Sequence, residues 1–153
     1  MSVPASPPLL AADTMLFIYH FENHPDFGPA AGRILGAAEG GRCRLVVSCL
    51  ALMEVLVVPE RHGEHELCRQ YRDFFRSFPN LEMMPIDGEL AEVASDLRAS
   101  HRIRTPDALH LATALRAGAR AFLTEDLGLG STPEIEVWSF RRALEHLPGL
   151  ESR

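Results

Sequence analysis

The chain of 153 residues contains no lysine, so arginine supplies every permanent positive side-chain charge. It has 15 basic and 21 acidic residues and a formal net charge of −6. This balance argues against indiscriminate binding to polyanions. A nucleic-acid partner would need a local patch of arginines, whose planar guanidinium groups bind phosphate through paired hydrogen bonds.

Long hydrophobic runs are also missing. The longest apolar stretch, Leu45–Val58, spans about 14 residues and contains Glu54, so it is too short to cross a bilayer. The N-terminal segment has no basic residue before its short apolar part, which makes it a poor signal peptide. We therefore expect no membrane segment and a cytoplasmic location.

Cysteine and histidine patterns typical of metal or disulfide scaffolds are absent. The three cysteines, Cys43, Cys49 and Cys68, are odd in number and lack the spacing of a zinc site. Among the seven histidines, His20 and His24 have HxxxH spacing, which supplies only two of the four ligands of a zinc site, and no HExxH motif occurs. A disulfide framework or a His/Cys zinc site is not expected, which agrees with a reducing compartment.

Strand-like and helix-like segments alternate along the chain. Short apolar runs predict strands at residues 8–12, 44–47, 81–86, 120–124 and 135–139, with helical patterns between and after them. Strands separated by helices imply crossover connections and a mainly parallel sheet, which is the α/β fold class. No change of composition divides the chain. We predict a flexible arm at 1–8, one domain at 9–147 and a C-terminal tail at 148–153.

The helix that carries Glu54 has recognisable ends. Ser48 is expected to cap its start, and Pro59 to end it. Glu54 shares one helical face, at spacings of three and four, with three apolar residues: Leu50, Met53 and Val57. The pattern predicts that the Glu54 carboxylate points inward.

Four carboxylates stand in apolar settings, namely Asp13, Glu54, Asp107 and Asp126. A buried, unpaired carboxylate costs several kcal/mol, so such residues need partners. Parallel sheets bind ligands beyond the carboxyl ends of their strands, where Asp13 and Asp126 are expected. Asp107, in the first turn of a helix starting at Thr105-Pro106, and Glu54 can reach this edge from their helices. We predict one shared site.

Four converging carboxylates cannot all stay ionised without compensation: either some of them are protonated, or cations bind between them. Two unit charges about 4 Å apart repel by roughly 4 kcal/mol at an effective dielectric near 20. An all-oxygen ligand set without His or Cys selects Mg²⁺ or Mn²⁺. Mg²⁺ usually binds substrate phosphate as well, so the predicted substrate is a phosphoester. One or two such ions can activate water for an in-line displacement.

Each acid also has a plainer interpretation. A strand-end aspartate such as Asp13 can serve as a turn cap. Asp107 can interact with the dipole of its helix, and Glu54 can pair with a nearby arginine. Glu125 is either an exposed neighbour of Asp126 or an additional ligand.

Four further residues flank the acids. Arg104 is the basic residue best placed to bind a phosphate. Thr14 and Thr124 can orient carboxylates or water through their hydroxyl groups. His110 follows Asp107 by about one turn, and either packs and hydrogen-bonds inside the protein or contacts the substrate.

Three segments resemble PIN-domain ribonucleases, more narrowly the VapC-like toxins of type II toxin–antitoxin pairs. They are ADTMLFIYHFENHP, VVSCLALMEVLVVP and, most specific, RTPDALHLATALRAGARAFLTEDLGL. The resemblance covers nearly the whole chain, from about residue 9 to 140. Carried over residue by residue, the family's acidic site falls on Asp13, Glu54, Asp107 and Asp126, the same four acids.

The resemblance implies a Rossmann-like three-layer α/β/α sandwich and a Mg²⁺- or Mn²⁺-dependent endoribonuclease acting on RNA. It also implies a homodimer and a cognate antitoxin whose tail lies over the acidic groove. Two positions depart from the family pattern. The family usually has Asn or Ser at the place of Met15, and Asn at the place of Glu125.

Two other functions stay open at this point. A catalytically silent PIN-like module, kept for binding an antitoxin or scaffold, is suggested by Met15, Glu125 and the acidic net charge. A flavodoxin-like phosphoacceptor domain would also place aspartates at strand ends. That fold needs a lysine near its site, and the chain has none.

Overall fold

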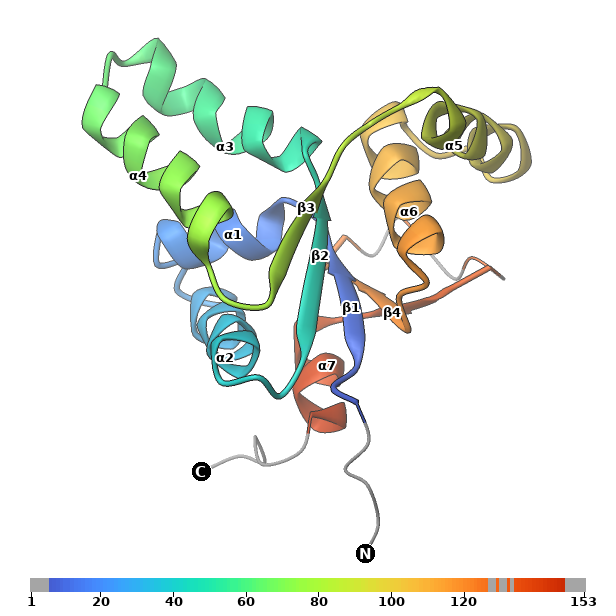
Figure 1. Ribbon diagram of the computed structural model, residues 1–153, viewed down its shortest axis with the longest axis horizontal. Helices are drawn as coiled ribbons and strands as arrows, with labels where there is room; N and C mark the ends of the chain where they lie inside the picture. Colours follow the sequence, from blue (N-terminus) through green and yellow to red (C-terminus); the bar gives the residue numbers. More distant parts are fainter. Residues whose placement is uncertain (1–5, 127–128, 130–131, 133, 148–153) are drawn as a thin grey trace, which may run out of the picture.

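A five-stranded, wholly parallel sheet forms the centre of the computed structural model, in the order β3-β2-β1-β4-β5 (Figure 1). The structure describes residues 6–126, 129, 132 and 134–147. Most of the expected arm and all of the expected tail lie outside these residues. The strands are β1 (Leu9–Ala12), β2 (Arg44–Ser48), β3 (Leu81–Met84), β4 (Ala121–Leu123) and β5 (Glu136–Trp138).

Helices cover both faces of the sheet. Alternate side chains of a strand point to opposite faces, so Leu10 and Ala12 enter one hydrophobic core and Ala11 the other. The first core receives α1 (Met15–Phe21), α2 (Gly28–Glu39), α3 (Leu50–Arg61), α4 (His65–Ser77) and α7 (Phe140–His146). The second receives α5 (Gly88–Ser100) and α6 (Thr105–Ala117), on the opposite side of the sheet in Figure 1. The predicted three-layer α/β/α sandwich is confirmed.

The strand order places the site. From central β1 the chain moves outward through β2 and β3, then crosses to the other side of β1 for β4 and β5. Ligand sites of such sheets lie beyond the strand ends where the order reverses. Here that point lies between β1 and β4, and a backbone hydrogen bond of 3.2 Å from Asp13 N to Leu123 O joins the two ends.

The end of α3 corrects one prediction. Pro59 lies inside the helix, which continues to Arg61. Pro59 cannot donate a backbone hydrogen bond and its ring crowds the preceding turn, but it stands in the last turn, where the helix continues for only two more residues. The start of α3 also shifts by one residue, because Cys49 occupies the cap position and Ser48 Oγ accepts from Leu50 N at 3.2 Å.

The orientation of α3 corrects a second prediction. Met53 and Val57 were expected to face inward, yet they are 61% and 40% exposed. The buried face consists of Ala51, Val55, Leu56 and Pro59. The helix is apolar around most of its circumference, so two faces fit the same spacing rule, and packing against the sheet and α4 selects between them. Glu54 consequently lies at the edge of the buried face, with 34% of its side chain exposed.

Other boundaries differ by a few residues. The third strand ends at Met84 instead of residue 86. Helix α6 begins at Thr105, with Arg104 at the cap position and no capping side chain. Gly118 then ends α6 with a left-handed φ of 70°, a conformation that glycine adopts at little cost. Among the described residues, every helix is too short or too polar to cross a bilayer.

Candidate active site

Asp13 is the most buried of the four acids, with 8% exposure, and directly follows β1. Its Oδ1 accepts a hydrogen bond from Met15 N at 3.0 Å, and its Oδ2 accepts one from Thr124 Oγ1 at 2.5 Å. Burial raises the pKa of this carboxyl above its ordinary value, against the opposing effects of Thr124 and His110. The site therefore holds a carboxylate in a setting where a nearby cation would be strongly favourable.

Thr124 and Met15 both hold the buried carboxylate in place. Besides donating to Asp13, the Thr124 hydroxyl accepts a hydrogen bond from Asp126 N at 3.0 Å, which holds Asp126 close to the end of β4. Met15 contributes its backbone amide, which any residue other than proline supplies. The departure from the family pattern at Met15 thus leaves Asp13 with two donors.

Arg104 lies between two of the acids. Its Nε donates to Asp107 Oδ2 at 3.2 Å, and its Nη2 lies 3.6 Å from Asp126 Oδ2. Asp107 is 20% exposed and Asp126 43% exposed, whereas Arg104 is 78% exposed. Because the Arg104 side chain is so exposed to solvent, neither ion pair contributes much to the free energy of unfolding. Its position shows that the two carboxylates share a space suited to a positive charge.

Glu54 belongs to a separate polar group. Its Oε1 accepts a hydrogen bond from Thr14 Oγ1 at 2.9 Å and lies 3.0 Å from His110 Nε2. Thr14 Oγ1 and His110 Nε2 are themselves 3.2 Å apart. The hydrogen bond from His110 lowers the pKa of Glu54, although partial burial opposes this. Thr14 and His110 are 3% and 4% exposed, so among the described residues Glu54 is paired with two buried side chains and not with the arginine of its plainer interpretation.

Glu125 has a role that the sequence did not indicate. Its Oε1 accepts a hydrogen bond of 2.7 Å from Phe140 N, the first residue of α7. The carboxylate thus satisfies a free amide at a helix start, where negative charge is favourable. Glu125 is only partly exposed, and one of its two carboxylate oxygens is bonded to the start of α7.

The four acids therefore reach the same end of the sheet in three hydrogen-bonded groups. In the described part of the chain, no three His, Cys, Asp or Glu side chains form a ready metal-binding group. The donor chemistry nevertheless fits Mg²⁺ or Mn²⁺, since all four side chains are carboxylates and Arg104 already holds a positive charge between two of them. Mg²⁺ often needs only one or two protein carboxylates, with water completing its shell. Asp13, Asp107 and Asp126 are the residues suited to hold it.

Comparison with known proteins decides the family. The sequence pattern of the PIN domain matches residues 11–135. The chain belongs to the PIN domain family. PIN domains are generally nucleases, a class of hydrolase. A search among curated proteins gave no match.

Solved structures show the same PIN fold. A toxin–antitoxin complex from Klebsiella pneumoniae superposes with a TM-score of 0.64 at 21% identity, covering 86% of this chain and 97% of that one. VapBC2 from Rickettsia felis, bound to a DNA fragment from its promoter, superposes with a TM-score of 0.67 at 18% identity, covering 86% of this chain and 98% of that one. VapC20 from Mycobacterium tuberculosis, described as a Sarcin-Ricin loop cleaving toxin, gives 0.63 at 15%, covering 83% and 98%. The PIN fold here is VapC-like.

Tyr19 is a residue of the PIN domain that the sequence did not single out. Burial raises the pKa of its hydroxyl, and the charges of Asp13, Glu125 and Asp126 raise it further. Its ring packs against His24, with a distance of 4.6 Å between ring centroids. The tyrosine therefore borders the acidic end of the sheet. Its place six residues after Asp13, on the first helix, is too weak a signal to find it.

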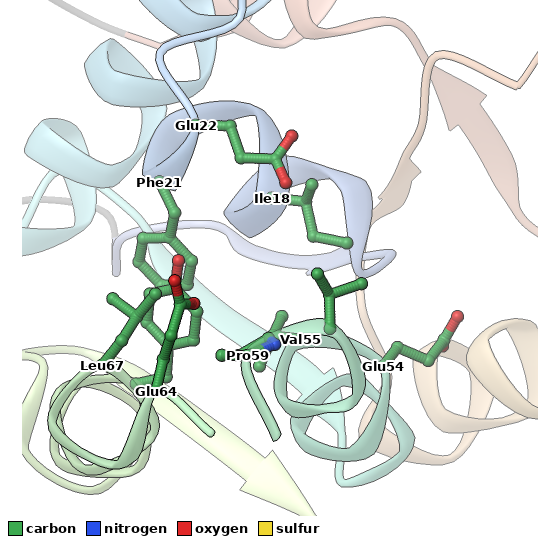
Figure 2. A pocket seen from close by; sticks show the side chains of 10 residues that line it. Ile18, Phe21, Glu22, Glu54, Val55, Pro59, Glu64 and Leu67 are labelled. Atoms are coloured by element: carbon green, nitrogen blue, oxygen red, sulfur yellow. The ribbon is translucent and has the colours of Figure 1, made fainter. Parts of the chain in front are cut away.

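A pocket of about 220 Å³ adjoins the PIN acidic site (Figure 2). It lies among α1, α3 and α4, and Figure 2 shows Ile18 and Val55 facing each other across it, with Glu54 to one side. Ten residues line it: Ile18, Phe21, Glu22, Glu54, Val55, Val58, Pro59, Glu64, Leu67 and Tyr71. Glu54 thus belongs both to the pocket and to the polar group with Thr14 and His110.

Proposed function

We propose that this PIN domain is a Mg²⁺- or Mn²⁺-dependent endoribonuclease and the toxin of a type II toxin–antitoxin pair. The observation that carries the proposal is the position of Arg104, held between Asp107 and Asp126 at the same strand ends as buried Asp13. Two carboxylates around one cationic position, with a third carboxylate buried at the neighbouring strand end, are in a family of nucleases best explained by a metal centre for phosphodiester cleavage.

The residues divide the work as follows. Asp13, Asp107 and Asp126 hold the metal, which when bound polarises the phosphate and makes a bound water more acidic. Glu54 completes the site or orients the attacking water. Thr124 holds Asp13 in place. Arg104 binds a substrate phosphate, for which its exposed guanidinium is suited.

RNA is the proposed substrate, supported by the VapC-like fold and by the neighbour described as cleaving the Sarcin-Ricin loop. An acidic protein must bind RNA through local positive charge. Arg98, Arg102 and Arg104, with His101, lie within seven residues that contain no acid, at the connection between α5 and α6. RNA binding through these phosphate contacts weakens steeply as salt rises.

An antitoxin is the proposed protein partner, and the pocket of Figure 2 is its proposed docking site. The pocket is mainly apolar and carries three glutamates, Glu22, Glu54 and Glu64. This combination fits an amphipathic segment that inserts an apolar side chain and pairs a basic one with the acids. Because Glu54 belongs to both places, such a segment would also block the catalytic site.

The central experiment is cleavage of total RNA by the purified protein with Mg²⁺, with Mn²⁺ and with EDTA. We expect cleavage only with metal, and none by the variant Asp13→Asn. Activity in EDTA, or equal activity of the variant, rejects the proposal.

Docking of the antitoxin has its own test. The genomic neighbourhood is first searched for a small reading frame that encodes a candidate antitoxin, and its product is the probe mixed with the purified PIN domain. Val58→Asp, in the pocket and 52% exposed, should weaken the complex at least tenfold. The control Ile86→Asp alters an apolar residue that is 38% exposed and outside the pocket, and should leave the complex unchanged. If Val58→Asp and Ile86→Asp bind the antitoxin with equal affinity, the antitoxin does not dock in this pocket.

A silent binding module is the second candidate. The ion pairs of Arg104 and the lack of a ready three-ligand group among the described residues favour it. Calorimetry separates the two functions. A nuclease should bind Mn²⁺ in a manner abolished by Asp107→Asn, whereas a silent module should bind none.

Homodimerisation also stays a prediction, which light scattering of the purified protein can test.

A further inference from the structure

We propose that His110 is a positioning residue that, together with Thr14, holds the Glu54 carboxylate so that one of its two oxygens is anchored and the other faces the catalytic site. The proposal rests on the nuclease function above and assigns to His110 a role other than contact with the substrate.

The anchoring of one oxygen follows from three distances. Glu54 Oε1 is 2.9 Å from Thr14 Oγ1 and 3.0 Å from His110 Nε2, so two donors meet at one acceptor atom. No hydrogen bond to Glu54 Oε2 occurs within the described residues. A carboxylate held at one oxygen keeps the second available for a water or a cation. Because Thr14 caps the start of α1 and His110 belongs to α6, they fix Glu54 of α3 against two other elements.

Burial separates this role from substrate binding. His110 is 4% exposed and Thr14 3% exposed, so neither can touch a bound RNA strand while the fold is intact. Glu54 is 34% exposed and therefore reaches the solvent side of the group. Among the four acids, Glu54 is the one that His110 contacts directly, so we assign the effect of His110 on the reaction to Glu54.

The ring orientation indicates the tautomer. His110 Nδ1 is buried and has no hydrogen-bond partner within the described residues. A buried N–H without a partner is costly, so the proton belongs on Nε2, where Glu54 Oε1 accepts it. The imidazole then donates from Nε2, comparable to the partners that orient ligating side chains in metal sites.

Two substitutions of His110 distinguish this role from packing. In His110→Gln the amide nitrogen reaches about as far along the side chain as Nε2, so the bond to Glu54 can be kept. In His110→Asn the amide reaches only the position of Nδ1 and the bond is lost. We expect His110→Asn to lower kcat for RNA cleavage roughly 10–100-fold, with KM nearly unchanged, and His110→Gln to keep most of the activity.

The control is Thr113→Val, on the same helix. Thr113 is 1% exposed and donates only to the carbonyl of Leu109 in its own helix. Its replacement disturbs a buried polar side chain of α6 without touching the acidic group. Thermal unfolding of each variant sets an assay temperature at which all are folded. Thr113→Val should then cleave RNA at the wild-type rate.

A double substitution tests whether the effect passes through Glu54. In a Glu54→Gln background, His110→Asn should cause no further loss, because the carboxylate that it positions is already gone. Calorimetric titration with Mn²⁺ gives the same comparison without RNA: His110→Asn should weaken Mn²⁺ binding in the wild-type background but not beside Glu54→Gln.

The outcomes are separable. Equal losses in His110→Asn and His110→Gln, a comparable loss in Thr113→Val, or an undiminished loss beside Glu54→Gln would each overturn the role of His110 while leaving the nuclease function intact. Wild-type activity and Mn²⁺ affinity in His110→Asn would do the same. A wild-type protein that neither binds Mn²⁺ nor cleaves RNA rejects the proposed function, and the positioning role with it.

Discussion

Thr124 donates its hydroxyl hydrogen to Asp13 Oδ2 at 2.5 Å, although the two residues stand 111 positions apart. The Thr124 hydroxyl oxygen in turn accepts a hydrogen bond from Asp126 N at 3.0 Å. One side chain thus joins the ends of β1 and β4 and sets the spacing between two of the proposed metal ligands. Charged hydrogen bonds of this kind are the strongest type available to a threonine.

The first prediction concerns this hydroxyl. Thr124→Val keeps the shape of the side chain but leaves the Asp13 carboxylate and the Asp126 amide without their partner. We expect a loss of about 1–3 kcal/mol in the free energy of unfolding, together with a clear loss of RNA cleavage. Thr124→Ser retains the hydroxyl and should keep most of both. Urea unfolding and cleavage assays measure the two effects, and a fully active valine variant would contradict the prediction.

The second prediction concerns pH. Burial raises the pKa of Asp13 above its ordinary value of 3.8. A carboxyl whose pKa is raised by folding stabilises the protein below its unfolded pKa, and this contribution is lost as pH rises through the folded pKa. At neutral pH the charge therefore weakens the fold, and Asp13→Asn should unfold at a higher temperature than the wild type.

Metal reverses this order. The difference in Tm between Asp13→Asn and the wild type should shrink as the pH falls toward 3.8, the ordinary pKa of an aspartate. Mn²⁺ should raise the Tm of the wild type but not of Asp13→Asn, because only the wild type binds it. Each kcal/mol corresponds to roughly 2–4 °C for a chain of this length. A variant less stable than the wild type at neutral pH without metal would contradict the assigned cause.

The third prediction concerns Arg104, whose guanidinium occupies the space between Asp107 and Asp126. Removing it should let Mn²⁺ bind more tightly, while RNA binding becomes weaker because a phosphate contact is lost. Arg104→Gln should therefore change the two affinities in opposite directions, by several-fold each. Calorimetry with Mn²⁺ and filter binding with RNA in EDTA measure them separately.

The matched control is Arg102→Gln, two residues earlier in the same connection. Arg102 is exposed and forms no ion pair with a described residue. Its loss should leave Mn²⁺ affinity nearly unchanged. If Arg104→Gln and Arg102→Gln bind Mn²⁺ equally tightly, the tighter binding comes from the lower positive charge of the protein as a whole. The prediction that Arg104 competes directly with the metal would then be wrong.

The fourth prediction concerns Glu125. Because its carboxylate accepts from Phe140 N at the start of α7, it should contribute to stability and not to metal binding. Glu125→Ala should lower the free energy of unfolding by about 1 kcal/mol, as loss of a helix cap does. Glu125→Gln keeps an acceptor oxygen and should cost less. Neither should change the affinity for Mn²⁺, and a large drop in that affinity would make Glu125 a ligand.

The fold class could be predicted from the sequence, and the four acids could be chosen from it as candidates, because both depend on local signals. Alternating strand and helix patterns indicate parallel crossovers, and carboxylates in apolar stretches stand out against the cost of burying charge. Asp13 follows its strand directly, and Asp107 lies in the first turn of its helix, as predicted. These features involve only neighbours along the chain.

The face of α3 and the partners of the acids were decided by the tertiary structure. The apolar sequence around Glu54 allowed two buried faces, and packing on the sheet selected the one with Ala51 and Val55. Thr14 and Glu54 are 40 residues apart, His110 and Glu54 are 56 apart, and Thr124 and Asp13 are 111 apart. Such pairs form only after the crossovers have placed strand ends and helix starts side by side. Local propensity carries no information about which donor then meets which oxygen, and that choice governs the chemistry of the site.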